Sequence, residues 1–219
     1  MGSSLYILGA GGMGREVYAA LIDLKMQDAV KGYIEDNSKR AGQLSLGKPI
    51  YDSEILKNLD RDKNALVSGI GNSVRKNFIE RSKNMGFNFK TVIHPSVIKS
   101  QWLNTGEGVV ILAGCVIVTD VHIGDFSYIN VSSVIGHDVN IGRYASISYS
   151  VNISGHVNIG NMTYVGAGTT IREKISIGSN SFIGMGSVVT KDIPDGVLAY
   201  GVPARVIKKI DENDIKKLI

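Results

Sequence analysis

The chain has 219 residues, with 24 Lys or Arg against 20 Asp or Glu, so its net charge near neutral pH is a modest +4. No basic stripe is interleaved with aromatic residues, which argues against nucleic-acid binding and favours small phosphorylated ligands. One cysteine excludes an intrachain disulfide and a metal site built from cysteines, and no apolar run approaches the roughly 20 residues that span a bilayer. We therefore expect a cytoplasmic protein in which Cys115 is a small core residue.

The N-terminal segment has the order strand, glycine turn, helix. Leu5–Leu8 is typical of a buried parallel strand, and it runs through Gly9-Ala-Gly-Gly-Met-Gly14 into a helical stretch over Arg15–Lys25. This is the context that a GxGxxG motif requires, because its glycines let backbone approach a ligand and the N–H groups at the helix start attract an anion. The nucleotide contacts predicted in this turn are Gly11, Gly12 and Met13.

Three more strands are expected before residue 95. They span Val30–Ile34, Ala65–Ile70 and Phe89–Ile93, with a helix ending at Met85 between the last two. Alternating strands and helices predict a small parallel α/β sheet, too short for a complete dinucleotide fold, which disfavours a dehydrogenase. His94 is expected to cap or pack. Residues at the strand ends are candidate nucleotide contacts, namely Asp36, Asn37, Gly71, Asn72 and Arg75. For Asp36 and Asn37, an ordinary polar strand end is an equally good explanation.

From Ile111 to Val189 an Ile or Val occupies every sixth position, fourteen times in succession. A period of six fits neither a helix nor a flat strand, and it predicts a parallel β-helix whose interior receives one β-branched side chain per hexapeptide. We number each hexapeptide so that this Ile or Val is its third residue. Glycine recurs at the fourth position, and we expect it there because corners need unusual backbone angles.

One corner of the repeat carries a candidate acid–base pair. Gly136-His137-Asp138 occupies positions four to six, where side chains leave the core. A neutral imidazole can accept a proton, and an adjacent carboxylate can fix its tautomer and stabilise its charged form. His122 and His156 lack this motif and are expected to be structural.

Several motifs together resemble the hexapeptide acyltransferases of the sialic acid O-acetyltransferase and nucleotide-amino-sugar N-acetyltransferase group. They are Gly9–Val17, Gly71-Asn72, His94–Ser96, Val134–Asp138 and Gly201–Ala204. The resemblance implies a Rossmann-like nucleotide-sugar-binding domain over residues 1–95, a left-handed β-helix over 96–210 and a C-terminal helix over 211–219. It further implies acetyl-CoA as cosubstrate, no metal, and a homotrimer with active sites between subunits.

The same resemblance assigns roles to individual residues. It makes His137 the catalytic histidine and Asp138 its acidic neighbour, and a coil of eighteen residues would stack Gly155 beside His137 and His156 beside Asp138. Many relatives have a histidine where this chain has Met13, which leaves the acceptor open. The implied acetyl-CoA contacts, most of which repeat formation also explains, are Ser146, Gly155, Ala167, Gly184, Met185, Pro203, Ala204 and Lys208.

The preferred function is acetyl-CoA-dependent N-acetylation of the 4-amino group of a UDP- or GDP-linked 4-amino-4,6-dideoxy sugar, with His137 as general base. Two alternatives stay open, namely O-acetylation of sialic acid or another sugar and a non-catalytic β-helix that binds a nucleotide sugar. A zinc carbonic anhydrase on the same kind of coil is disfavoured, because the chain has no closely spaced His-x4-His pair.

Overall fold

The computed structural model describes residues 3–36, 39–71, 75–211 and 214. It divides into an N-terminal unit of residues 1–95 and a C-terminal unit of residues 96–219. The helix predicted over residues 211–219 lies outside the described residues apart from Asp211 and Asp214. No helix in the described part of the chain is long and apolar enough to cross a bilayer.

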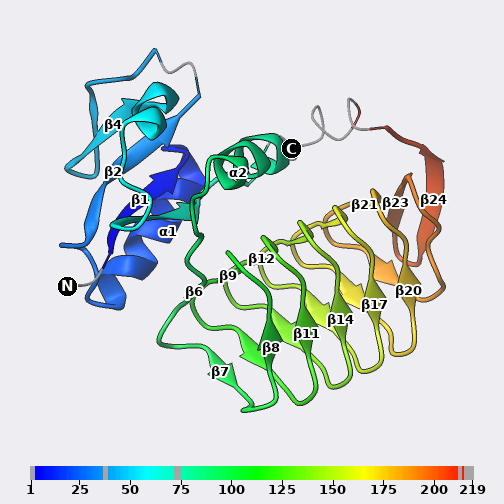
Figure 1. Cartoon of the computed structure of the whole chain (residues 1–219). Coiled ribbons are helices and arrows are strands. Elements are labelled where there is room, and N and C mark those ends of the chain that lie inside the picture. Colours follow the sequence, from blue (N-terminus) through cyan, green and yellow to red (C-terminus); the bar gives the residue numbers. More distant parts are fainter. Residues whose placement is uncertain (1–2, 37–38, 72–74, 212–213, 215–219) are drawn as a thin grey trace. The chain divides into compact units, whose positions relative to one another are not determined.

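A five-stranded sheet with the order β3-β4-β2-β1-β5 forms the centre of the N-terminal unit (Figure 1). Its parallel strands are β1 (Ser4–Leu8), β2 (Val30–Glu35), β4 (Lys48–Asp52) and β5 (Asn64–Ser68). The short β3 (Leu44–Ser45) runs antiparallel to β4. The helices are α1 (Gly12–Asp23), the 3₁₀ helix η1 (Ser53–Lys57) and α2 (Arg75–Asn84). Ile7, Leu8 and Ile34 are completely buried, as expected of central parallel strands.

One strand prediction in this unit was wrong, and one strand was missed. The stretch Phe89–Ile93 is not a strand of the five-stranded sheet, because Phe89 makes only an isolated bridge to Leu66 and the strand β6 is limited to Val92–Ile93. The sheet contains β4 instead, which sequence reasoning missed. A proline at its second position and a single buried residue, Ile50, hide the usual pattern of a strand.

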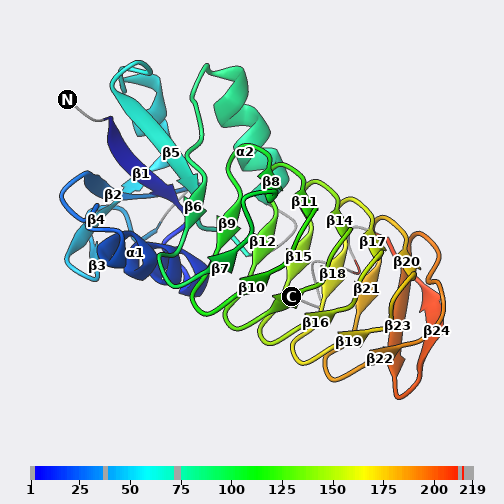
Figure 2. The ribbon, with the colours of Figure 1, turned by 90° about the horizontal axis from the view of Figure 1, so that it is seen from below.

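The C-terminal unit is a parallel β-helix that repeats every eighteen residues. Val116 pairs with Val134, and Val134 pairs with Asn152, so the predicted coil of three hexapeptides is confirmed. Each coil adds one two-residue strand to each of three sheets (Figures 1 and 2). The first sheet consists of β7 (Ile98–Lys99), β10 (Val116–Ile117), β13 (Val134–Ile135), β16 (Asn152–Ile153), β19 (Thr170–Ile171) and β22 (Val188–Val189).

The other two sheets follow the same register. The second consists of β8 (Asn104–Thr105), β11 (His122–Ile123), β14 (Asn140–Ile141), β17 (Asn158–Ile159) and β20 (Ser176–Ile177). The third includes β9 (Val110–Ile111), β12 (Tyr128–Ile129), β15 (Ser146–Ile147), β18 (Tyr164–Val165), β21 (Phe182–Ile183), β23 (Val197–Gly201) and β24 (Ala204–Lys209). Strand β24 is antiparallel to β23, so the chain leaves the coil as a hairpin.

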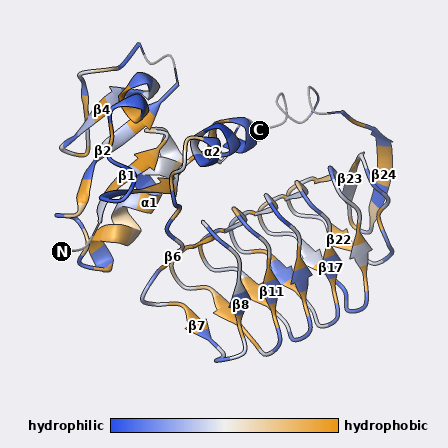
Figure 3. Cartoon of the chain, in the orientation of Figure 1, coloured by the Kyte–Doolittle hydropathy of each residue, from blue (hydrophilic) through white to orange (hydrophobic). Residues whose placement is uncertain are grey.

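Two columns of side chains fill the coil, where the sequence pattern revealed one. The Ile or Val at position three is at most 3% exposed throughout, and Figure 3 shows hydrophobic and hydrophilic residues alternating along each coil. Position one is equally buried but is more varied, because it holds Val, Ala and Ile together with Cys, Ser and Thr. Cys115 is one of these residues, which confirms it as a core residue, and burial raises the pKa of its thiol.

The buried hydroxyl groups at position one satisfy backbone groups of the next coil. Ser133 Oγ donates to the carbonyl of Ser148 at 2.9 Å and accepts the N–H of Val151 at 3.2 Å. Ser127 and Thr163 make equivalent bonds to Gly142 and Gly178. Since a buried polar group is costly unless it is bonded, this repeated exchange explains why polar residues are accepted in the core column.

The unusual backbone angles lie at position six instead of position four. Ten non-glycine residues at position six from Asp120 to Asn180 have φ between 53° and 62°, in the left-handed region. The glycines at position four have a different reason, since a Cβ at Gly124 would lie 2.7 Å from the backbone nitrogen of Arg143 in the next coil. Close approach of consecutive coils, not left-handed backbone, therefore selects glycine at the fourth position.

Replacing Ser133 with alanine tests this internal bonding. It leaves the Ser148 carbonyl and the Val151 N–H without their buried partner, so we expect the free energy of unfolding to fall by about 1–3 kcal/mol. The control is Ser176→Ala at an exposed position of β20, which should change stability by less than about 0.5 kcal/mol. Urea denaturation measures both, and equal effects of the two substitutions would contradict the interpretation.

Candidate active site

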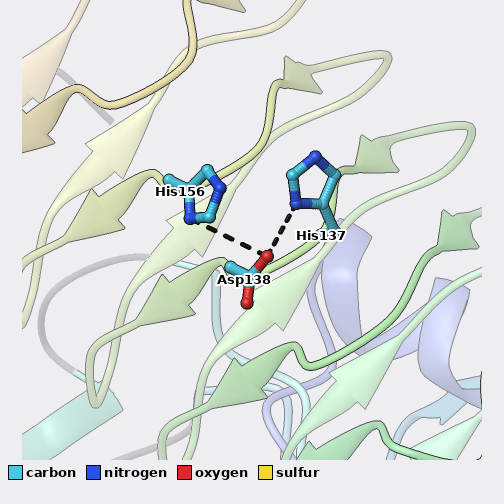
Figure 4. Close-up of side chains that lie close together, drawn as sticks. All are labelled: His137, Asp138 and His156. Atoms are coloured by element: carbon cyan, nitrogen blue, oxygen red, sulfur yellow. Dashed lines mark hydrogen bonds and ion pairs between the residues drawn. The ribbon is translucent and has the colours of Figure 1, made fainter.

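The corner that follows β13 brings His137 and Asp138 into contact (Figure 4). His137 Nδ1 lies 2.7 Å from Asp138 Oδ2, and both side chains are about half exposed, at 52% and 48%. A ring nitrogen bonded to a carboxylate carries the proton, which leaves Nε2 of a neutral ring as an acceptor. The imidazole and the carboxylate that the sequence analysis singled out are therefore in contact in the folded chain.

Backbone geometry fixes the Asp138 carboxylate next to this ring. Asp138 has φ of 55°, a conformation that aspartate tolerates better than most residues. Its N–H donates to the carbonyl of Thr119 in the preceding coil at 3.1 Å. The hydrogen bond from His137 is the main reason why the pKa of Asp138 is lowered, so the carboxylate is ionised at neutral pH.

His156 joins the pair from the next coil, beside Asp138 as the eighteen-residue coil predicted, although the sequence analysis assigned it only a structural role. Its Nδ1 lies 3.7 Å from Asp138 Oδ2, and the rings of His137 and His156 meet edge to face with centroids 4.9 Å apart. Figure 4 shows the two imidazoles flanking one carboxylate. The eighteen-residue register was the available signal, since it stacks position 156 on position 138.

Gly155 forms the floor beneath the His137 ring. A Cβ at this position would come within 2.5 Å of the ring atoms Cε1 and Nε2. The N–H of His156 then bonds the carbonyl of His137 at 2.9 Å and ties the two coils together. A glycine at 155 is therefore a steric requirement of the side-chain arrangement, as the predicted stacking indicated.

The N–H of Gly155 distinguishes this corner from another corner of the coil. At the corner that follows the second sheet, side chains one coil further on accept the backbone N–H of the residue at position five. The Asn161 side chain accepts the N–H of Arg143, and the Ser179 side chain accepts the N–H of Asn161. The N–H of Gly155 has no acceptor among the described residues. A donor without a partner beside an imidazole is suited to binding an oxyanion.

The three side chains of this corner also form the only set of possible metal ligands found in the described part of the chain. One donor atom each of His137, Asp138 and His156 lies within 4.8 Å of the others. All three are exposed, and the hydrogen bond and ring contact described above account for the arrangement without an ion.

The residues predicted to contact acetyl-CoA occupy several places on the coil. Ser146 is buried in β15, Ala167 is half-buried at the corner after β18, and Met185 is 81% exposed after β21. Gly184 lies against Tyr200 of the hairpin, since a Cβ there would be 2.7 Å from the Tyr200 Cβ. Of the predicted acetyl-CoA contacts on the coil, Gly155 lies against His137. The structure shows no contact of Ser146, Ala167, Gly184 or Met185 with His137 or Asp138.

The hairpin at the end of the coil contains the remaining predicted contacts. Pro203 lies exposed between β23 and β24, Ala204 is buried at the start of β24, and Lys208 is an exposed strand residue 3.4 Å from Asp214. Lys208 thus projects from a strand, not from the polar face of a helix.

In the N-terminal unit, the glycines of the first turn divide into two kinds. A Cβ at Gly11 or Gly12 would meet nothing within 4 Å, whereas a Cβ at Gly14 would overlap the Gly9 carbonyl oxygen. Met13 packs its side chain toward Gly71, at the end of the neighbouring strand β5. Packing therefore leaves open space at Gly11 and Gly12, at the start of α1.

The carboxylates after β2 are both engaged. Glu35, which the predicted contacts omitted, accepts the N–H of Ala10 at 3.1 Å and pairs with Arg40. Asp36 accepts Arg81 Nη2 at 2.8 Å and Ser53 Oγ at 2.8 Å, and the Arg81 bond is the main cause of its lowered pKa. The glycine turn thus has an acidic neighbour in Glu35.

Arg75 is buried rather than open to a ligand. It is 2% exposed and donates from Nη1 to the carbonyl of Gly71 at 3.1 Å. Asn37 and Asn72, the other predicted contacts here, lie outside the described residues.

Comparisons with known proteins match both units. The family model described as PglD N-terminal domain matches residues 4–82, and the one described as Bacterial transferase hexapeptide (six repeats) matches residues 156–191. A mutant of perosamine N-acetyltransferase from Caulobacter crescentus, solved in complex with CoA and GDP-perosamine, is 30% identical with a TM-score of 0.88. That alignment covers 94% of this chain and 98% of the other.

Two further solved structures are similar. The acetyltransferase domain of PglB from Neisseria gonorrhoeae FA1090 is 26% identical with a TM-score of 0.86, over 93% of this chain and 99% of that one. WeeI from Acinetobacter baumannii AYE is 25% identical with a TM-score of 0.59, over 94% and 100%. The search of curated protein sequences gave no match. The structural likeness thus extends over nearly the whole chain.

The hydrogen bond between His137 and Asp138 makes a measurable prediction. Replacing His137 with alanine removes the main cause of the lowered carboxyl pKa, so we expect the pKa of Asp138 to rise toward the ordinary value of an aspartate side chain. ¹³C NMR titration of the carboxyl carbon measures it, with His122→Ala as the control. An unchanged pKa in His137→Ala would contradict the interpretation.

The same shift has a defined effect on stability. Because the pKa is lowered in the folded state, the carboxylate stabilises the fold above the unfolded pKa, and this contribution is lost as the pH falls through the folded value.

Proposed function

Because this chain belongs to the hexapeptide-repeat sugar acetyltransferases, which use acetyl-CoA, we propose that it N-acetylates the 4-amino group of a nucleotide-linked 4-amino-4,6-dideoxy sugar. The observation that carries the proposal is the corner at which His137 lies over Gly155 with Nδ1 bonded to Asp138. A relative named perosamine N-acetyltransferase, crystallised with CoA and GDP-perosamine, supports an amino sugar as acceptor.

The chemistry at His137 follows from its hydrogen bond. Asp138 holds the proton on Nδ1, so Nε2 can accept a proton from the amine as the amine nitrogen attacks. Asp138 then stabilises the imidazolium that forms. Acetyl-CoA supplies an activated acyl group as a thioester, and the imidazolium is the source of the proton for the departing thiolate.

Gly155 supports the same reaction from the other side. Its N–H has no acceptor in the described part of the chain, and it has no side chain to obstruct an approaching carbonyl. We infer that this N–H donates to the oxyanion that develops on the acetyl carbonyl, a role worth about 10²–10³ in kcat when such a donor is removed.

The N-terminal unit supplies a site for the nucleotide in this proposal. The open glycines Gly11 and Gly12 at the N-terminus of α1 present backbone N–H groups to the diphosphate. Glu35 and Asp36 lie at the end of the adjacent strand β2 and accept hydrogen bonds, which suits them to the ribose or base. We further propose a homotrimer with the active sites between subunits.

A panel of acceptors tests the function. Protein and acetyl-CoA are mixed with GDP-perosamine, with UDP-linked 4-amino-4,6-dideoxy sugars, and with sialic acid, and release of free thiol is followed. We expect turnover with at least one nucleotide-linked amino sugar and none with sialic acid. Turnover of sialic acid alone would establish O-acetylation instead, and no turnover with any acceptor would favour a binding protein.

Substitution of His137 tests the proposed base. We expect His137→Ala to lower kcat by about 10²-fold or more, because a general base contributes about 10²–10⁴. The exposed His122 in β11 provides the matched control, and His122→Ala should retain the parental rate. A His137→Ala rate above about a tenth of the parental rate would indicate that positioning, not proton transfer, carries the acceleration.

A further inference from the structure

Asp138 lies next to two imidazoles, and the proposed reaction uses only the imidazole of His137. His137 Nδ1 and His156 Nδ1 approach the same oxygen, Asp138 Oδ2, at 2.7 Å and 3.7 Å. Both rings are 52% exposed, and their centroids are 4.9 Å apart, so one small molecule can reach both. In the described part of the chain, the Nε2 atom of neither ring has a hydrogen-bond partner.

The coil does not need an imidazole at position 156. The coil-to-coil bond at this point is made by the His156 backbone N–H and the His137 carbonyl, without either side chain. The same position is glycine in other coils, for example Gly114, Gly168 and Gly186, which adopt the same left-handed backbone. The side chain of His156 therefore has no structural task that the repeat imposes.

Acetylation of an amine requires two proton transfers before the product forms. An amine flanked by electron-withdrawing oxygens titrates near the value of an α-amino group, about 7.7–8.0. At pH 6.5, roughly one acceptor molecule in twenty is then the free amine, and the remainder is ammonium that cannot attack. The ammonium must first lose one proton, and the attacking amine loses a second.

We propose, on the basis of the proposed function, that His156 is a second catalytic residue that accepts the first proton of the bound acceptor ammonium. Loss of that proton to His156 Nε2 frees the amine, which forms the N–C bond while His137 takes the second proton. The C–S bond then breaks, and the His137 imidazolium protonates the thiolate. His156 returns its proton to solvent, so the net products are the amide, free thiol and one proton.

The charges around His156 are compatible with this role. Asp138 and His137 face it from the preceding coil, as described above. In the following coil, the residues in register are Glu173 beside Gly155 and Lys174 beside His156, and the N–H of Lys174 bonds the carbonyl of Gly155 at 3.0 Å. The Asp138 carboxylate oxygen, 3.7 Å from His156 Nδ1, offers an opposite charge to a transient imidazolium on His156.

The test uses the acceptor that turns over in the panel, GDP-perosamine or a UDP-linked 4-amino-4,6-dideoxy sugar, and measures kcat/KM from pH 6.5 to pH 9. In His156→Gln the side chain keeps a polar amide near Asp138, 3.7 Å from His156 Nδ1 in the parent, but it cannot accept a proton. We expect a loss of about tenfold or more at pH 6.5, where free amine is scarce, and less than about twofold at pH 9, where it predominates.

Two further variants make the outcome specific. His156→Asn, which suits a left-handed backbone, should show the same pH-dependent loss, and His122→Gln should show none. A loss that is equal at all pH values would mean that His156 only positions Asp138, and full activity of both variants at pH 6.5 would mean that it has no role. Either result overturns the proposal. Absence of turnover by the unaltered protein would instead overturn the proposed function, and the role of His156 with it.

Discussion

The parallel ladder between consecutive coils is the constraint on which the functional corner depends. Each residue lies beside the residue eighteen positions further along, as the pairing of Val134 with Asn152 and of Asn140 with Asn158 shows. A short motif therefore cannot form a site alone, because its surroundings belong to the neighbouring coils. Gly155 lies beneath the His137 ring, and His156 brings a second imidazole to the carboxylate of Asp138 that His137 already bonds.

The corner also departs from the bonding that the repeat provides elsewhere. Side chains bond the backbone N–H groups of Arg143 and Asn161, and these bonds make one edge of the coil self-sufficient. Glycine at position 155 cannot make such a bond to the preceding coil, and its own N–H has no acceptor among the described residues. This corner therefore offers an unsatisfied donor beside the His137 ring, and such a donor favours a developing negative charge.

Much of this architecture could be predicted from the sequence because its strongest signal is geometric. A column of Ile or Val at every sixth residue requires a coil, and the coil fixes the register that brings position 156 to position 138. The period does not state how side chains turn at a corner, so His156 was assigned a structural role although the register places it beside Asp138. Strand β4 was missed for a local reason, since Pro49 and one buried residue conceal a strand that its neighbours stabilise.

The role of a glycine cannot be assigned from its residue type alone, because the structure gives different reasons for glycine at different positions. At position four of the coil, glycine was expected for its backbone freedom, but the close approach of the next coil is what excludes a Cβ there. In the first turn, Gly14 is required for packing against the Gly9 carbonyl, whereas packing makes no such demand on Gly11 or Gly12. A glycine that packing does not require is the stronger indication of a ligand, because only an approaching molecule then gains from its missing side chain.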